Sequence, residues 1–258
     1  MTNPSSLATK EPDFKAEFFA DLYEMESDNF WFRGRNKIIV WALNKYFSKP
    51  GNYLEVGCGT GYVLAHVKAR CKQFNVSGSE LFEEGLSFAR KRMPDVNLFR
   101  LDARKMPFTQ EYDVIGSFDV LEHIEEDEKV LSELWRATKH GLILTVPQHQ
   151  FLWSAVDELG GHKRRYSAVE LRAKLEKAGF TIVRMTSFVS LLLPLFVLSR
   201  LKKRNQRTLD KSEFDMPVLL NRSLEVVLDI ERWLLKSGIN LPMGGSLLVI
   251  ATKNQTAL

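Results

Sequence analysis

The stretch LEVGCGTGYVLAHV, residues 54–67, decides which fold this sequence predicts. Gly57, Gly59 and Gly61 stand at alternate positions behind the acidic Glu55, and a helical pattern follows them directly. A glycine-rich turn between a strand and a helix lets backbone N–H groups approach a ligand, because a side chain there would block the approach. The ligand is a phosphate, a dinucleotide or another nucleotide-like molecule, unless the glycines form only a tight turn.

The spacing of the glycines separates these alternatives. A phosphate-binding P-loop requires GxxxxGK[ST], and no lysine follows Gly61. A dinucleotide fold prefers GxGxxG, whereas this turn reads GxGxG. A tight turn without a ligand leaves the acidic residues around it unexplained. The motif therefore favours a nucleotide-like ligand without a pyrophosphate.

Two acidic residues at the ends of the next strands extend this interpretation. Glu80 closes NVSGSE nineteen positions after Gly61, a distance that suits a carboxylate accepting from two ribose hydroxyls. Asp102 closes the following strand in LFRLDARKMPF, where a carboxylate can accept from an exocyclic adenine amine. The set predicts a receptor for an adenosine that carries a zwitterionic tail.

The rest of the chain alternates short β-branched runs with helical patterns, which is typical of a doubly wound α/β core. We expect strands at 52–56, 74–80, 96–102, 112–119, 141–147, 180–187 and 246–253. The expected helices are two N-terminal ones, 14–24 and 35–47, and then one after Gly61, 81–93, 126–139 and one between the N-cap Ser167 and Gly179. The predicted divisions are a helical cap at 1–50, a core at 51–187, a helical insertion at 188–245 and a last strand with a tail at 246–258.

Composition limits the classes of protein. A chain of 258 residues with 45% hydrophobic residues can bury a sizeable core. Its net charge of +4 is too modest to indicate nucleic-acid binding, and two cysteines indicate neither a disulfide framework nor a zinc site. The first thirty residues are polar and charged, so we expect no signal peptide and a cytoplasmic location.

The motifs LEVGCGTG, GSE, LDARKMPF, YDVIGSFDVLEHI and AGF resemble, in this order, the class I S-adenosylmethionine-dependent methyltransferases, and are similar to the ubiquinone-type O-methyltransferases and small-molecule methyltransferases. The resemblance implies a seven-stranded Rossmann-like sheet of order 3-2-1-4-5-7-6 with strand 7 antiparallel. It also implies S-adenosylmethionine as the cofactor and S-adenosylhomocysteine as the product. The implied donor-binding residues are Glu55, Gly57, Gly59, Gly61, Glu80, Leu81, Asp102, Ala103, Asp119 and Arg35.

The resemblance also implies roles within that set. Glu80 would hold the ribose hydroxyls, Asp102 and the Ala103 backbone would read the adenine, and Glu55 would organise the loop or meet the methionine ammonium. The segment FWFRGR, residues 30–35, would cap the donor pocket, with Arg35 or Arg33 on the methionine carboxylate.

Methyl transfer from a sulfonium is an in-line displacement, and an oxygen nucleophile benefits from a base that takes its proton. FDVLEHI, residues 118–124, leaves the fourth predicted strand at the edge where ligands bind in such sheets. His123 is the first candidate base, with a histidine packed under the donor as the alternative. Asp119 is placed to approach the sulfonium or the acceptor.

Asp119, Glu122 and His123 are also similar to the acidic, acidic, histidine pattern of the ubiquinone O-methyltransferases, some of which use a divalent cation. This chain has Asp where that pattern has Glu, and neighbouring side chains rarely both ligate from a helix. We therefore expect no metal, with magnesium as the alternative.

GHKRRYS, residues 161–167, precedes the best-capped helix of the chain. Its functional interpretation is a clamp for an anionic substrate: Arg164 or Arg165 grips a phosphate or carboxylate, Tyr166 follows, and His162 acts as an acid or base. His149 on the same loop is a further substrate-site candidate. The alternative is a solvated loop.

The segment FVSLLLPLFVLSRLKKRNQR, residues 188–207, is apolar and then basic. It is too short to span a bilayer, which needs about 20 apolar residues. It suits either a buried lid or an interfacial segment whose Lys202, Lys203, Arg204 and Arg207 face anionic headgroups. A second amphipathic helix at 218–236 can pair with it in a small cap over a greasy or bulky acceptor.

The sequence thus predicts a methyltransferase, most simply an O-methyltransferase, that acts on an anionic or lipid-linked small molecule. Glycan precursors, prenylated quinone precursors and secondary metabolites are the candidate acceptors. Two alternatives stay open: a non-catalytic partner subunit that only binds the donor, and a nucleic-acid methyltransferase, although no (N/D)PPY-like motif is present. The expected location is cytoplasmic, with a membrane-associated one open through residues 188–207.

Overall fold

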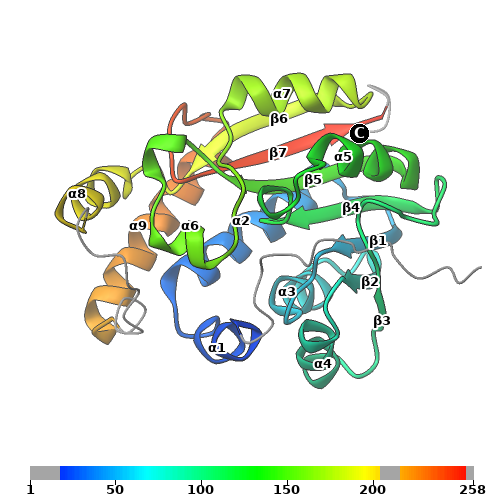
Figure 1. The fold of residues 1–258 in the computed structure, drawn as a ribbon, viewed down its shortest axis with the longest axis horizontal. Helices are drawn as coiled ribbons and strands as arrows, with labels where there is room; N and C mark the ends of the chain where they lie inside the picture. The colour runs from blue at the N-terminus through cyan, green and yellow to red at the C-terminus, as the bar shows by residue number, and fades with distance from the viewer. Residues whose placement is uncertain (1–17, 204–215, 254–258) are drawn as a thin grey trace, which may run out of the picture.

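The structure, a computed structural model, describes residues 18–203 and 216–253. Its centre is a seven-stranded sheet of order β3-β2-β1-β4-β5-β7-β6 (Figure 1). The first five strands run parallel, and β7 runs antiparallel to both of its neighbours. The predicted order and the reversed last strand are confirmed. The strands are β1 Gly51–Val56, β2 Phe74–Glu80, β3 Asn97–Arg100, β4 Tyr112–Phe118, β5 Thr138–Pro147, β6 Thr181–Phe188 and β7 Ser246–Thr252.

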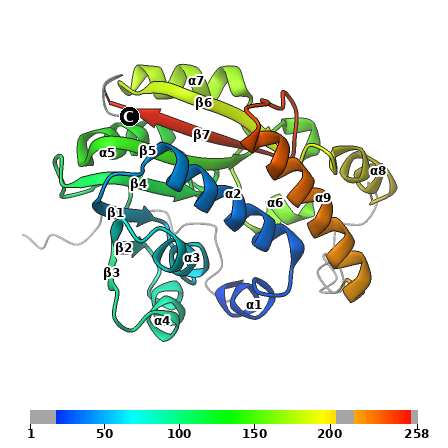
Figure 2. The same cartoon turned by 180° about the vertical axis from the view of Figure 1, so that it is seen from behind.

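Helices cover both faces of the sheet, because its central strands are apolar on both sides. Along β1, Tyr53 packs into one core and Leu54 into the other, as the alternation of side chains in a strand requires. The face in front in Figure 2 carries α2 (Phe30–Tyr46), α3 (Tyr62–Arg70) and α9 (Val218–Lys236). α4 (Glu83–Arg92) packs into the same core. The face in front in Figure 1 carries α5 (Asp127–Ala137) and α7 (Ala168–Lys177).

The helix expected at 35–47 begins earlier, at Phe30, so FWFRGR is its first part and not a connection. Asn29 is the N-cap, and its side-chain oxygen accepts a hydrogen bond from Trp31 N at 2.9 Å. Gly34 lies inside this helix, where a glycine is usually unfavourable. In the fold it allows α9 to approach, because a Cβ there would lie 2.4 Å from Leu228 Cδ1.

Two short helices that the sequence pattern did not predict follow β5. They are η2 (Gln150–Leu152), a 3-10 turn, and α6 (Ala155–Leu159). Ser154 caps α6 together with Asp157, whose carboxylate accepts from Ser154 N at 2.8 Å. The predicted cap of α7 is confirmed: Ser167 Oγ accepts from Glu170 N at 3.1 Å.

The predicted insertion between β6 and β7 is present as α8 (Leu193–Lys203) and α9. α9 lies along α2, where Arg33 pairs with Glu225 and Lys37 with Asp229, each at 2.8 Å. The remaining N-terminal helix is α1 (Phe18–Met25). Across the described ranges, no helix combines the length and the apolar character needed to cross a membrane. Residues 14–17 of the first predicted helix and 204–207 of the basic segment lie outside the described residues.

Candidate active site

A large cavity lies at the carboxyl ends of β1, β2 and β4, where ligands bind in open α/β sheets. Its volume is about 1220 Å³, more than the roughly 300–1,000 Å³ of ordinary ligand pockets, so two ligands can occupy it together. The turn after β1 forms its floor, and α1, the first turns of α2 and the residues around α8 close its sides.

The three glycines of the turn have different environments. All have positive φ, at +75° for Gly57, +52° for Gly59 and +76° for Gly61. A Cβ on Gly57 would lie 2.4 Å from Val120, and one on Gly61 would lie 2.8 Å from Met93. Among the described residues, a Cβ on Gly59 would meet only Phe19, at 3.7 Å. Gly59 is therefore the glycine that opens the backbone toward a ligand, and the other two allow the protein itself to pack.

Glu80, at the end of β2, holds this turn in place. Its Oε2 accepts from Gly59 N at 3.0 Å, and its Oε1 accepts from Leu81 N at 2.7 Å and from Phe82 N at 3.2 Å. Burial raises the pKa of this carboxyl, and the three backbone N–H groups act against that rise. Glu80 and Leu81 both line the cavity, next to the donor site that the sequence predicts.

Glu55 presents an unsatisfied carboxylate oxygen. Its side chain is only 2% exposed, and Oε2 accepts no hydrogen bond from the described part of the chain. Burial raises its pKa well above the usual value, while the nearby Arg35 acts in the opposite direction. A backbone hydrogen bond from Leu64 reaches the carboxylate, but a buried oxygen without a partner is costly, so Oε2 suits a ligand that brings a positive charge.

The predicted adenine-binding residues line the cavity near the end of β3. Asp102 accepts from Arg104 N and from Arg104 Nε, both at 2.9 Å, and the carboxylate forms an ion pair with the same guanidinium. Burial acts to raise the pKa of Asp102, but these hydrogen bonds leave it lowered. Ala103 is buried beside it. Asp102 is thus ionised and retained by its neighbour.

Arg35 and Asp119 form an ion pair across the cavity wall. Arg35 is 8% exposed, and its guanidinium lies over the Trp31 ring at 4.5 Å. Asp119 has φ +56°, and its other carboxylate oxygen accepts from Thr145 Oγ1 at 3.2 Å. The pair fixes the first turns of α2 to the end of β4. Arg33, the other candidate for the donor carboxylate, instead pairs with Glu225.

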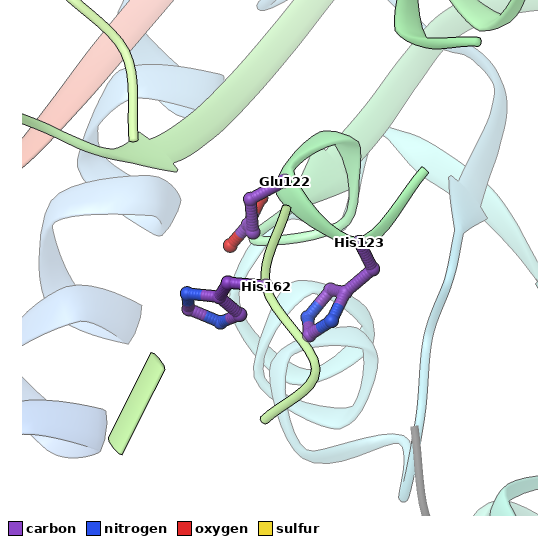
Figure 3. Close-up of side chains that lie close together, drawn as sticks. All are labelled: Glu122, His123 and His162. Atoms are coloured by element: carbon purple, nitrogen blue, oxygen red, sulfur yellow. The ribbon is translucent and has the colours of Figure 1, made fainter. Parts of the chain in front are cut away.

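Three side chains meet farther along the cavity, as Figure 3 shows. Glu122 and His123 come from η1 (Leu121–His123), the 3-10 turn after β4, and His162 comes from the loop after α6. The two imidazole rings lie 4.7 Å apart. Burial lowers the pKa of His123 to about 3, with a further contribution from His162. His123 is therefore neutral at physiological pH.

Glu122 is completely buried, and neither of its carboxylate oxygens accepts a hydrogen bond from a described residue. Burial raises its pKa well above the usual value, and the negative charge of Asp119 adds to the rise. Figure 3 shows its carboxylate turned toward the His162 ring. This group is poised to receive a hydrogen-bond donor or a cation from within the cavity.

His162 is held by Asp157. The distance from His162 Nδ1 to Asp157 Oδ1 is 2.8 Å, and Arg165 Nε and Nη2 bind the same carboxylate at 2.8 and 3.0 Å. Burial acts to raise the pKa of Asp157, but these partners keep it well below its usual range. The ionised Asp157 therefore fixes the proton of His162 on Nδ1 and leaves Nε2 as an acceptor.

Of the other residues of the predicted anion clamp, Arg164, Tyr166 and His149 do not line the cavity. Arg164 pairs with Asp127 at 2.9 Å, and the fully buried Tyr166 donates to the same carboxylate at 2.7 Å. His149 stacks on Phe151 with ring centroids 5.0 Å apart. Arg165 does line the cavity, but Asp157 already binds its guanidinium. Buried acids of the protein thus already bind both arginines.

The sequence interpretation missed two acidic residues of the site. Asp157 carried a signal, since Ser154 three positions earlier makes a helix cap with it. The sequence around Glu26, which follows α1, contains no such signal. Glu26 lines the cavity and accepts from Thr60 Oγ1 in the glycine turn at 2.6 Å, and only the fold brings these segments together.

Glu122, His123 and His162 can also hold a metal ion. Their ligand atoms all lie within 4.8 Å of one another, and one carboxylate with two histidines is a ligand set that catalytic zinc uses. The ligand set considered from the sequence contained Asp119 instead, which the structure pairs with Arg35.

Comparison with known proteins identifies the family to which this chain belongs. The family model described as a methyltransferase domain matches residues 27–185, which include the glycine turn, Glu80, Asp102 and the Asp157–His162 pair. The chain belongs to this methyltransferase family. Its methyl donor is S-adenosylmethionine, and the open backbone at Gly59 and the unsatisfied oxygen of Glu55 fit the donor and its ammonium group.

Individual relatives share moderate identity with this methyltransferase. A probable S-adenosylmethionine-dependent methyltransferase of Mycolicibacterium smegmatis is 29% identical over 61% of this chain and 62% of its own length. Ajmaline N-methyltransferase of Rauvolfia serpentina is 29% identical over 57% of this chain and 52% of its own. The chain thus matches between about half and two thirds of the length of these relatives.

A solved structure confirms the fold. It is a chain of the complex between the Haloferax volcanii Trm112 methyltransferase activator and a methyltransferase, with a TM-score of 0.63 and 18% identity. The match covers 95% of this chain and 97% of that one.

Proposed function

We propose that this methyltransferase transfers a methyl group to a hydroxyl oxygen of a small, lipid-linked acceptor, with His162 taking the hydroxyl proton. The Asp157–His162 pair on the cavity wall carries the proposal. An ionised, buried carboxylate behind an imidazole is the arrangement that orients a general base and stabilises its protonated form.

Some residues of the chain align the methyl donor, and others take the proton of the acceptor. S-adenosylmethionine supplies an electrophilic methyl group on its sulfonium. Glu55 binds the donor's ammonium, and Gly59 lets the backbone lie against the donor. His162 accepts the acceptor's proton on Nε2 while Asp157 keeps the Nδ1–H in place. The aromatic and aliphatic side chains around the cavity exclude water from the displacement.

The apolar end of the cavity supports a lipid-linked acceptor. Leu192, Phe196 and Met216 line it beside α8, and Leu224 of α9 continues the same wall. Leu195 both lines the cavity and is 55% exposed, so the cavity opens to the outside at this point. An acceptor with a polar reacting end and a long apolar body fits between His162 and this opening. An anionic acceptor is less favoured, because Arg164 and Arg165 are bound to Asp127 and Asp157.

Methylation of an amine is the second candidate, and Glu122 favours it. Its buried carboxylate has two oxygens that accept no hydrogen bond from the described residues, and an amine offers N–H donors to both. The similarity to ajmaline N-methyltransferase adds to this alternative.

The test is turnover with labelled S-adenosylmethionine in lipid and aqueous extracts, followed by mass spectrometry of the product. We expect a methylated product from the lipid extract, with the new methyl on oxygen, and about 10²–10⁴-fold slower formation by the His162→Gln variant. A product methylated on nitrogen would replace the first proposal with the second. Binding of S-adenosylhomocysteine without turnover in any extract would instead favour a non-catalytic partner subunit.

A further inference from the structure

α9 presents an apolar face to solvent along its whole length. Leu219, Val226, Ile230 and Trp233 are spaced by seven, four and three residues, which puts them on one side of a helix. Their exposed fractions are 81%, 57%, 50% and 64%. A helix on a protein surface normally turns its polar side chains outward, so a row of exposed apolar residues marks a contact surface.

Of the acidic residues of α9, Glu225 and Glu231 lie off this face, and Asp229 lies beside it. Glu225 pairs with Arg33 and Lys37, and Asp229 pairs with Lys37. Glu231 is buried and accepts backbone hydrogen bonds from residues 189–191. Cations therefore pair with Glu225 and Asp229, and backbone N–H groups bind Glu231 on the protein side of the helix.

Two exposed cations flank the apolar row, with Asp229 between them on the same side of the helix, since positions 222, 229 and 236 are seven residues apart. Arg222 is exposed one turn after Leu219, and Lys236 is exposed at the end of the helix. The outward side of α9 thus combines large apolar side chains with a net positive charge, since Asp229 is paired with Lys37 and Arg232. This combination is complementary to a lipid surface with anionic headgroups.

The same end of the molecule holds the opening of the cavity. Figures 1 and 2 both show α8 beside α9, away from the edge of the sheet formed by β3. Leu191, Leu195 and Leu198 are exposed on and just before α8, and Leu195 lies at the cavity opening.

We propose that the outward face of α9, with the exposed leucines of α8, docks this protein on an anionic lipid bilayer. The contact is peripheral, and it places the cavity opening beside the membrane. Delivery of a lipid-linked acceptor through that opening rests on the proposed function, whereas the docking itself does not.

The experiment is co-sedimentation of the full chain with vesicles of phosphatidylcholine, with and without phosphatidylglycerol. We expect binding to the anionic vesicles and roughly tenfold weaker binding after Trp233→Glu or Ile230→Glu, since each puts a negative charge on the docking face. Val169→Glu is the matched control. Val169 is 80% exposed on α7 and lies outside this face, so its variant should bind as the unmodified protein does.

Size-exclusion chromatography and affinity for S-adenosylhomocysteine show whether each variant keeps its fold and its oligomeric state. The proposal is overturned if the protein does not sediment with anionic vesicles, or if Trp233→Glu and Val169→Glu reduce binding equally. A dimer that Trp233→Glu dissociates would assign the face to a second copy instead. Vesicle binding that persists without any turnover would leave the docking surface in place and reject the proposed function alone.

Discussion

Replacing Gly59 by alanine tests the donor site with little disturbance of the protein interior. At φ +52° an alanine costs about 1–2 kcal/mol relative to glycine. Its methyl group would meet no described atom closer than Phe19 Cε1 at 3.7 Å, so it would project into space meant for the donor. Overpacking a tight contact by one methyl group costs about 1–3 kcal/mol. This corresponds to a Kd for S-adenosylhomocysteine weaker by about 5- to 150-fold.

Gly238→Ala is the matched control, because Gly238 also has a positive φ, at +92°, and a Cβ there would meet nothing within 4 Å. Both variants carry the cost of the left-handed backbone, but only Gly59→Ala changes the cavity. Titration calorimetry with S-adenosylhomocysteine and urea unfolding should show similar losses of unfolding free energy and a loss of affinity in Gly59→Ala alone. Equal affinities in the two variants would refute the assignment of Gly59 to the donor.

Three further predictions concern the charged groups of the cavity. Glu55→Gln should weaken S-adenosylhomocysteine binding and yet raise the free energy of unfolding at neutral pH. Burial raises the folded-state pKa of Glu55, so ionisation costs stability as pH rises above its ordinary pKa, and urea unfolding should show the gain vanishing in acid. Asp157→Asn should lower kcat by about 10²–10⁴-fold, because His162 loses its orientation, with KM for the donor nearly unchanged; a normal kcat would exclude His162 as the base. A chelator should leave turnover unchanged if Glu122, His123 and His162 work without a metal, and a loss that added zinc restores would assign them as ligands.

Local patterns predicted the strands and the glycine turn because each depends on residues close in sequence, whereas the order of the strands came from the resemblance to the methyltransferases. The apolar run of β7 and the cap of α7 by Ser167 were recognisable in this way. The predicted start of α2 was too late, because a glycine such as Gly34 is unfavourable inside a helix. Only the fold shows that Leu228 of α9 packs on this glycine. The ion pairs of Arg164 and Arg165 were not predicted for the same kind of reason. Their partners, Asp127 and Asp157, lie 37 and 8 residues away and meet them only in the fold.

By itself the sequence determined the donor side of this methyltransferase. Gly59 is recognisable because the turn places a glycine at positive φ, and Glu80 is recognisable because it ends a strand. Short segments of sequence specify both features. Only the tertiary structure decided the rest of the cavity: which histidine a buried carboxylate orients, which arginines are already bound, and which apolar side chains line its far end. Those features depend on burial and on charge pairs between segments far apart along the chain, such as Arg35 with Asp119 and Glu26 with Thr60. No local pattern predicts such pairs, because the two groups approach each other and leave water only when the chain folds.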